Sequence, residues 1–336
     1  MAIRETKPRW SDVPPALRAR IGELAGAPPT SAGTVYGGYG PSATFRVRLA
    51  DGRSAFLKGA GPGSNDVNWR CVPKEEAAYA RVASIRPNAP AFLGAVRMDG
   101  WHLLLLEDLR GARRVPPWSR ALARAAVEQV AAFHLRSQSE PAAVPPLEPQ
   151  GLCDNWRVLR EDAAGRAAFL HLFAAGRAEA EDWLRGAHGA LASAEARATD
   201  PGQPFGLLHM DIRSDNLRFD RSGRLLLFDW ASLARGPCAL DLYGFLPSLL
   251  AESALPWQEP ADVYRAALAA GGQSVPAWAE AAAAAAIAGY FALRAGQPPL
   301  PGLPRLRAVQ KSQLGPALSI AAQVLGLPEP PPLPPA

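Results

Sequence analysis

The property of this sequence that most constrains its fold is a change in residue pattern near residue 107. Before that point, short runs of β-branched and aromatic residues alternate with turn signals, which is typical of an antiparallel sheet. Five strands are predicted: Thr34–Tyr39, Thr44–Leu49, Ser54–Lys58, Ala91–Arg97 and Trp101–Glu107. One helix, Pro73–Val82, is predicted between the third and fourth strands, because proline in a first helical turn loses no hydrogen bond.

After residue 107 the chain is dominated by Ala-, Leu- and Arg-rich segments with apolar residues at helical spacing. Helices are predicted within Ser119–Ser137, Arg166–Thr199 and Leu240–Leu325, and short strands within Phe205–Asp229. We therefore expect an α+β chain with a small five-stranded antiparallel β lobe at residues 1–106, a hinge at 107–111 and a larger, mainly helical lobe at 112–325. The Pro-rich tail at 326–336 is predicted to be disordered or polyproline II.

Composition excludes several other classes of protein. At 336 residues the chain is about twice the usual domain length, and 48% hydrophobic residues exclude a largely disordered chain. The net charge of +5 is too small and too scattered for a nucleic-acid-binding protein. Three distant cysteines support neither a disulfide framework nor a zinc site, no signal peptide is visible, and the longest apolar stretch is too short for a membrane span. We expect a cytoplasmic protein, monomeric or homodimeric.

The strongest chemical signal is a polar loop between two apolar runs. Leu207–Asn216 has the sequence L-L-H-M-D-I-R-S-D-N, and the run Arg224–Trp230 that follows ends in Asp-Trp. Phosphoryl transfer needs a carboxylate near the acceptor hydroxyl and oxygen ligands that hold Mg²⁺ against nucleotide phosphates. Asp211 would supply the carboxylate, and Asn216 and Asp229 would supply the ligands.

This pattern resembles the catalytic core of the aminoglycoside phosphotransferase family, a broad group of small-molecule kinases. Its elements are H-x-D-x-x-x-x-N, then a strand ending in Asp-Trp, then G-x-x-x-x-D-L at Gly236–Leu242. The resemblance covers most of the chain. It implies a protein-kinase-like two-lobed fold, ATP and Mg²⁺ as cofactors, and a small-molecule hydroxyl as the phosphate acceptor.

The resemblance also implies roles for the residues of the loop. Asp211 matches the catalytic aspartate, and Asn216 and Asp229 match the metal-binding pair. His209 would position the loop, and Asp241 would stabilise its backbone.

Two further positions bear on the relation of this chain to protein kinases. Arg213 stands where many protein kinases have a lysine facing the transferred phosphate, and an arginine fork suits phosphate oxygens. Trp230-Ala231 replaces the Phe-Gly of protein kinases, so the usual activation-segment switch is absent. This difference disfavours a regulated protein kinase.

The N-terminal strands would bind the nucleotide. Only four of the 36 basic residues are lysines, so each retained lysine is a candidate for a specific role. Lys58 ends an apolar strand, where a cation is costly unless anions receive it. By the resemblance it would contact the α- and β-phosphates and pair with an acid of the next helix. The resemblance implies that Glu75 is the better candidate, because family members place this glutamate four residues before an aromatic residue, here Tyr79; Glu76 is the alternative.

The remaining nucleotide contacts are expected from a Gly-rich turn and the hinge. The turn contains Gly38, Gly40 and Ser42, whose backbone N–H groups and hydroxyl would cover the phosphates. By the resemblance, the backbone from Glu107 to Leu109 would hydrogen-bond the adenine edge.

Other enzyme classes fit the sequence less well. An iron-binding facial triad needs a second histidine downstream, and His209 is the last histidine of the chain. No G-x-S-x-G is present for a serine hydrolase. The string Gly38–Ala43 matches a dinucleotide fingerprint but is followed by a strand, where that fingerprint requires a helix. A nucleotide-binding pseudokinase or scaffold and, less favoured, a protein kinase stay open as alternatives.

The charges of the last third of the chain bear on the acceptor. From Leu242 onward acids and bases balance, and several aromatic residues suggest an apolar or mixed wall: Trp257, Tyr264, Trp278, Tyr290 and Phe291. A site for a polycationic aminoglycoside needs an excess of acids. The sequence therefore favours a sugar, an amino alcohol or a macrolide-like compound, with an aminoglycoside as the less favoured acceptor.

Overall fold

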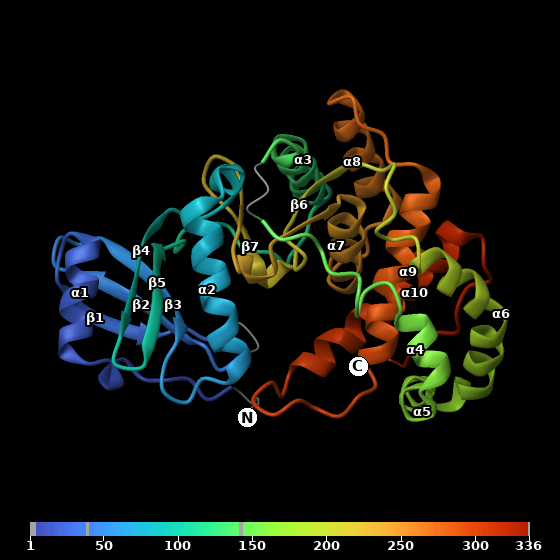
Figure 1. Ribbon diagram of the computed structural model, residues 1–336, viewed down its shortest axis with the longest axis horizontal. Coiled ribbons are helices and arrows are strands. Elements are labelled where there is room, and N and C mark those ends of the chain that lie inside the picture. Colours follow the sequence, from blue (N-terminus) through green and yellow to red (C-terminus); the bar gives the residue numbers. More distant parts are fainter. Residues whose placement is uncertain (1–4, 38–39, 141–143, 335–336) are drawn as a thin grey trace. The chain divides into compact units, whose positions relative to one another are not determined.

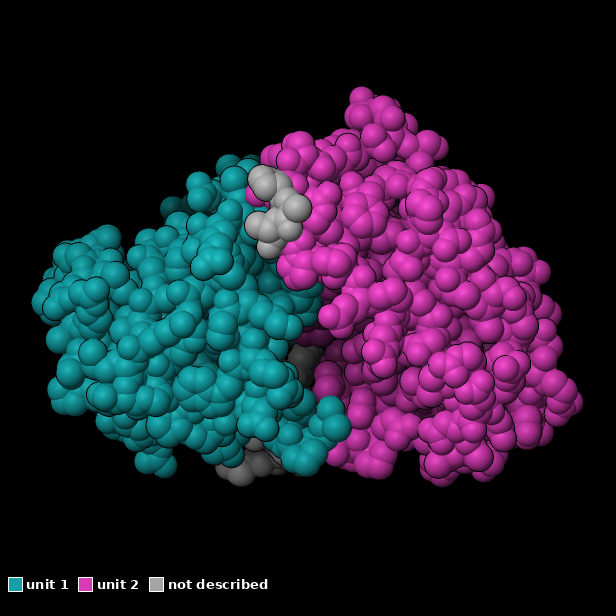
Figure 2. Space-filling view, in the orientation of Figure 1, with its two compact units in different colours: residues 1–115, 215–233, 300–304 teal, residues 116–214, 234–299, 305–336 magenta. Residues whose placement is uncertain are grey.

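The structure is a computed structural model, and it describes residues 5–37, 40–140 and 144–334 (Figure 1). The chain divides into two compact units, coloured separately in Figure 2. Unit 1 comprises residues 1–115, 215–233 and 300–304, and unit 2 comprises residues 116–214, 234–299 and 305–336. Unit 1 contains a five-stranded antiparallel sheet and unit 2 is mainly helical, so the predicted fold class is confirmed.

The sheet of unit 1 has the strand order β1-β2-β3-β5-β4. Its strands are β1 (Pro29–Thr34), β2 (Ala43–Leu49), β3 (Ser54–Ala60), β4 (Phe92–Met98) and β5 (Trp101–Glu107). Two helices, α1 (Pro15–Ala25) and α2 (Asp66–Arg81), lie on opposite sides of it (Figure 1). Alternate residues of β2 and β3 pack with α1 in the core, including Phe45 and Leu57, so the residues between them face the other side.

Two predicted boundaries in unit 1 are wrong. The first strand ends at Thr34, because the chain leaves the ladder at the Gly-rich turn after Val35; Tyr39, its predicted end, lies outside the described residues. Helix α2 begins at Asp66 and not at Pro73, since the Asn65 side chain accepts a hydrogen bond from the Asn68 N–H at 2.9 Å and caps the helix. The proline lies inside the helix, where it removes one backbone donor.

Short strands and 3₁₀ turns within residues 215–233 also belong to unit 1. The hairpin of β7 (Leu217–Phe219) and β8 (Leu225–Leu227) is hydrogen-bonded to the first part of the chain. Arg113 and Phe219 exchange backbone hydrogen bonds of 2.6 and 3.0 Å, and the Asn88 side chain donates to the Leu225 carbonyl at 3.0 Å. The sequence-based boundaries assign this hairpin to the helical lobe, but its hydrogen bonds tie it to unit 1.

Unit 2 is built from eight α-helices within the described residues. They are α3 (Arg120–Ser137), α4 (Asn155–Glu161), α5 (Ala163–His171), α6 (Arg177–Glu195), α7 (Ala239–Ala251), α8 (Gln258–Ala270), α9 (Ala277–Arg294) and α10 (Leu306–Leu325). Helix α9 contacts α4, α5, α6, α7 and α10, and its alanines allow this close packing. Strands β6 (Phe205–Leu208) and β9 (Ala234–Pro237) form a two-stranded sheet.

The Pro-rich tail, predicted to be disordered or polyproline II, contacts helices of unit 2 in its described part. Its described part has no regular secondary structure, but the Trp183 indole donates a hydrogen bond of 2.8 Å to the Pro328 carbonyl. Glu329 accepts a hydrogen bond from Ser319 of α10. The tail therefore has a defined course along α6 and α10. Among the described helices, none is long and apolar enough to cross a membrane.

Candidate active site

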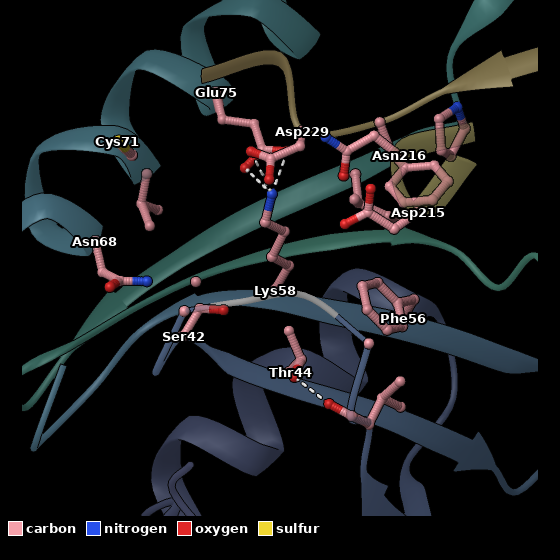
Figure 3. Close-up of a pocket in the computed structure, with 18 of the residues that line it drawn as sticks. Ser42, Thr44, Phe56, Lys58, Asn68, Cys71, Glu75, Asp215, Asn216 and Asp229 are labelled. Carbon is pink, nitrogen blue, oxygen red and sulfur yellow. Dashed lines mark hydrogen bonds and ion pairs between the residues drawn. The ribbon is translucent and has the colours of Figure 1, made fainter. Parts of the chain in front are cut away.

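Three charged side chains converge in unit 1 (Figure 3). The Lys58 ammonium on β3 lies 2.9 Å from a carboxylate oxygen of Glu75 on α2 and 2.8 Å from one of Asp229, which follows β8. Glu75 is almost completely buried, whereas the Asp229 side chain is 40% exposed. The structure therefore brings together three of the residues singled out in the sequence, from three separate elements.

The alternative acid, Glu76, has different partners. Its carboxylate lies 2.6 Å from the Arg97 guanidinium and 2.6 Å from His102 Nε2, on the neighbouring strands β4 and β5. Successive residues of a helix point in directions about 100° apart, so only one of the two glutamates can face Lys58. That glutamate is Glu75.

The electrostatics of this cluster leave a negative charge. Burial alone would lower the pKa of Lys58, but Asp229 and Glu75 outweigh it and the net pKa is raised, so the ammonium stays charged. Burial raises the pKa of Glu75, Lys58 opposes this, and Asp229 adds to the increase. One ammonium between two carboxylates has a formal charge of −1, which favours a further cation beside Asp229.

A cavity of about 320 Å³ surrounds Lys58 and is lined by residues of unit 1 alone. Of the predicted nucleotide contacts, Gly40, Ser42, Glu107 and Leu109 line it together with Lys58 and Glu75. Gly38 lies outside the described residues. The cavity is large enough for a small-molecule ligand.

The cavity is also lined by aromatic and arginine side chains that the sequence patterns did not single out. Phe56 and Phe228 line it, and the Arg218 guanidinium lies 5.4 Å from the centre of the Phe228 ring. Burial, and secondarily Arg114, lowers the pKa of Arg218 to about 10. Phe56 could have been found from the sequence, since it lies two residues before Lys58 and alternate strand residues share a face.

The hinge is tied to β2 by a buried carboxylate. The two oxygens of Asp108 share one bifurcated hydrogen bond from Arg46 Nε–H, with N···O distances of 2.9 and 3.1 Å, and Asp108 accepts another from the Ser54 hydroxyl at 2.7 Å. Its side chain is 2% exposed. These bonds fix the peptide between Glu107 and Leu109, two residues that border the cavity.

The two proposed metal ligands stand at the ends of the β7–β8 hairpin. The Asn216 carbonyl accepts a hydrogen bond of 3.0 Å from the Phe228 N–H, and both Asn216 and Asp229 line the cavity. Asp229 has a φ of 73°, a left-handed conformation that is uncommon for a residue with a side chain. Trp230 is fully buried, and its indole donates to the Leu227 carbonyl at 2.9 Å. These contacts on both sides of Asp229 hold its backbone in the left-handed conformation.

The oxygen chemistry of this pair suits magnesium. No group of three or more His, Cys, Asp or Glu residues in the described part of the chain could hold a metal by itself. Asn216 offers an amide oxygen and Asp229 a carboxylate. Mg²⁺ is commonly held by one or two such side chains together with waters and substrate phosphates, so these residues fit it.

In unit 2, the predicted catalytic loop is held by Asp241 at the start of α7. One Asp241 oxygen accepts from the His209 N–H and the other from the Met210 N–H, both at 2.7 Å. Met210 has a left-handed φ of 63°. His209 is buried, and its Nδ1 accepts a hydrogen bond of 3.2 Å from the Asp211 N–H. The loop backbone before and at Asp211 is thereby fixed.

The side chains of Asp211 and Arg213 form an ion pair of 2.7 Å. Their side chains are 33% and 19% exposed, respectively. Residues at i and i+2 of an extended segment lie on the same side of the chain, which is why these two side chains can contact each other. Asp211 and Arg213 belong to unit 2, whereas Asn216 and Asp229 belong to unit 1.

A five-stranded lobe with a buried Lys–Glu pair, and a helical unit with an H-x-D loop, define a protein-kinase-like phosphotransferase. A family model named APH and described as the phosphotransferase enzyme family matches residues 36–290. The chain belongs to this family, which confirms the resemblance stated from the motifs and the prediction of a small-molecule phosphotransferase. No curated protein sequence matches the chain significantly.

Solved structures share the fold at low sequence identity. The choline kinase LicA from Streptococcus pneumoniae is 15% identical with a TM-score of 0.57, and the match covers 92% of this chain and 98% of that one. A choline/ethanolamine kinase family protein from Mesorhizobium loti is 19% identical, with a TM-score of 0.58 and coverages of 93% and 96%. A spectinomycin phosphotransferase with bound ADP and spectinomycin is 12% identical, with a TM-score of 0.61 and coverages of 92% and 98%.

Proposed function

We propose that this protein transfers the γ-phosphoryl group of ATP, with Mg²⁺, to a hydroxyl of a small molecule. The observation that carries the proposal is the Lys58 ammonium between Glu75 and Asp229 at the wall of a cavity in unit 1. A buried ammonium held by two acids is placed to receive nucleotide phosphates. The neighbour with bound ADP supports the choice of an adenine nucleotide.

The cavity lining suggests how the nucleotide binds. Phe56 offers an aromatic face for a purine, and stacking of this kind is favourable for any base. The Glu107 carbonyl and the Leu109 N–H would hydrogen-bond the adenine edge. Gly40 and Ser42 would contact the phosphates, and Gly38 is included in this proposal from the sequence alone.

Asn216 and Asp229 would hold the magnesium ion. When bound there, the ion supplies positive charge that neutralises the phosphate oxygens during transfer. The net negative charge of Lys58, Glu75 and Asp229 favours its binding. Asp229 is the more exposed of the two acids, so it is the one that a ligand can reach beside Lys58.

Asp211 would accept the proton of the acceptor hydroxyl as that oxygen bonds to the γ-phosphorus. The bond from the γ-phosphorus to the β–γ bridging oxygen then breaks, and ADP leaves. Arg213, already paired with Asp211, would present further N–H donors to the transferred phosphoryl group. His209 and Asp241 position the loop and do not react.

The five acids after Leu242 support an acceptor that is not a polycation. All five acids after Leu242 have partners within unit 2. Glu252 accepts hydrogen bonds from Trp118 and Ser214, Asp262 and Glu280 pair with Arg265, Glu329 accepts from Ser319, and Glu259 forms an ion pair of 3.6 Å with Arg120. The charge of a paired carboxylate is partly cancelled by its partner, so it attracts a further cation less strongly. A sugar, an amino alcohol or a macrolide-like compound therefore suits the protein better than an aminoglycoside. We further propose a cytoplasmic enzyme, monomeric or homodimeric.

A phosphorylation screen tests the function. The purified protein is incubated with Mg-ATP and a panel of sugars, amino alcohols, macrolides and aminoglycosides, and products are detected by mass. We expect a mass increase of one phosphoryl group on a member of the first three classes, and none with Asp211→Ala. Nucleotide binding without transfer to any compound would instead identify a pseudokinase.

A further inference from the structure

The cavity contains a second lysine, contributed by the segment that precedes α1. Lys7 lies in a stretch without regular structure, yet it is only 8% exposed and lines the same cavity as Lys58. Lysine is rarely buried to this extent unless its ammonium is paired. Lys74, by contrast, is exposed on α2 and is not part of the cavity wall.

The position of the Lys7 ammonium is fixed by Thr44. Lys7 Nζ donates a hydrogen bond of 2.8 Å to the Thr44 hydroxyl, which itself donates to the Val35 carbonyl at 2.7 Å. Val35 and Thr44 flank the Gly-rich turn, whose ends are joined by the hydrogen bond from the Val35 N–H to the Thr44 carbonyl. Lys7 is therefore anchored where this turn begins and ends.

The register of the sheet relates this anchor to Lys58. Thr44 on β2 is directly opposite Lys58 on β3, so the two side chains leave the same face of the sheet, with Cβ atoms about 5 Å apart. Figure 3 shows Thr44, Ser42 and Lys58 at the same cavity wall. An ammonium bonded to Thr44 is thus placed beside the region assigned to the nucleotide phosphates.

We propose that Lys7 is a second phosphate-binding lysine, which contacts the polyphosphate of the nucleotide from the side of the Gly-rich turn. The inference rests on the proposed function. The Thr44 hydroxyl accepts one N–H of the ammonium and so holds Lys7 at the wall of the cavity. The N-terminal segment is then part of the nucleotide site.

Calorimetric titration of Lys7→Met tests the proposal, with Lys74→Met as the matched control. Affinity is measured for Mg-ATP, Mg-ADP and adenosine. We expect Lys7→Met to bind Mg-ATP and Mg-ADP about tenfold more weakly, the size of one charged hydrogen bond, with adenosine unchanged. Lys7→Arg should restore most of the affinity, and Lys74→Met should bind all three ligands like the wild type.

A purely structural role gives a different result. If Lys7 only holds its segment on the sheet, Lys7→Met will lower the affinity for adenosine as much as the affinity for Mg-ATP, and the proposal is overturned. Glu5→Gln provides the comparison, because Glu5 is buried on the same segment but does not line the cavity. Glu5→Gln should lower the melting temperature, but any loss of affinity should be equal for adenosine and Mg-ATP.

Two outcomes separate this inference from the proposed function. If the wild-type protein binds no nucleotide, the proposed function itself is refuted. If the wild type binds Mg-ATP and Lys7→Met binds it with the same affinity, only this inference is refuted.

Discussion

The two groups of proposed catalytic residues are held in place by different means. In unit 1, Lys58, Glu75 and Asp229 fix one another through side-chain ion pairs. In unit 2, the side chain of Asp241 fixes backbone N–H groups of the loop that carries Asp211. The ion pairs of unit 1 keep charged groups in place for a ligand. The hydrogen bonds of Asp241 in unit 2 position the carboxylate of Asp211. Substitutions in unit 1 should therefore affect binding, and substitutions in the loop should affect chemistry.

The largest expected effect is that of Asp211→Ala on turnover. Loss of the proton acceptor should lower kcat by about a thousandfold or more, while the affinity for Mg-ATP changes little. Steady-state kinetics and nucleotide titration measure the two quantities separately. Asp182→Ala, at an exposed position of α6, is the control. A parallel loss of nucleotide affinity in Asp211→Ala would break the distinction between the two units.

Asp229→Ala should show the opposite pattern. Without this carboxylate, Mg²⁺ loses one of its two protein ligands, and the affinity for Mg-ATP should fall by about a hundredfold. Titrations with Mg²⁺ and with a chelator measure how much of the affinity depends on the metal. The metal-dependent part should vanish in the variant. If it persists, Asp229 is not a magnesium ligand.

A pH titration should distinguish the stabilities of the two units. Glu195 at the end of α6 is buried, and burial raises its pKa to about 7, although N–H groups of Asn155 and Trp156 lower it. Between its ordinary pKa of 4.5 and about 7 the folded state holds more protons than the unfolded state. The free energy of unfolding should therefore fall as pH rises through this window, by about 3 kcal/mol.

Denaturant unfolding of the wild type and of Glu195→Gln measures this contribution as a difference between the two pH profiles. The variant cannot titrate at this position, so its profile should be flatter between pH 4.5 and 7. Mg-ATP should stabilise unit 1 similarly in both proteins. Identical slopes would show that Glu195 is ionised in the folded state throughout.

Phe56→Ala should have the smallest effect. Loss of a stacking surface should lower the affinities for adenosine and for Mg-ATP by similar factors, about fivefold, because the phosphate contacts remain. Lys7→Met should leave the affinity for adenosine unchanged, so comparing the two variants separates base contacts from phosphate contacts within unit 1. A selective loss for Mg-ATP in Phe56→Ala would contradict this assignment.

Those parts of the site that a linear motif encodes can be predicted from the sequence. Lys58 ends an apolar run and Asp229 follows one, and strand ends can be recognised from such runs. The resemblance favours Glu75 over Glu76, and the contact of Glu75 with Lys58 agrees with that preference. The start of α2 is mispredicted because the side-chain cap at Asn65 outweighs the proline signal.

The positions of Lys7 and Arg218 in the cavity could not be predicted, for a physical reason. Their places in the cavity depend on long-range contacts, such as the bond from Lys7 to Thr44, 37 residues away. No local periodicity encodes such a contact. The assignment of residues 215–233 to unit 1 is of the same kind, since it rests on hydrogen bonds to Asn88 and Arg113.

That assignment has a consequence for experiments on fragments. A truncation at the hinge would discard Asn216 and Asp229 and leave Lys58 with one buried acid and no metal ligands. A nucleotide-binding fragment would need the β7–β8 hairpin joined to residue 115 by a new linker. Insertions that lengthen the chain at 214–215 or 233–234 should therefore disrupt phosphoryl transfer more than insertions of equal length at the exposed turn of Asp51 and Gly52.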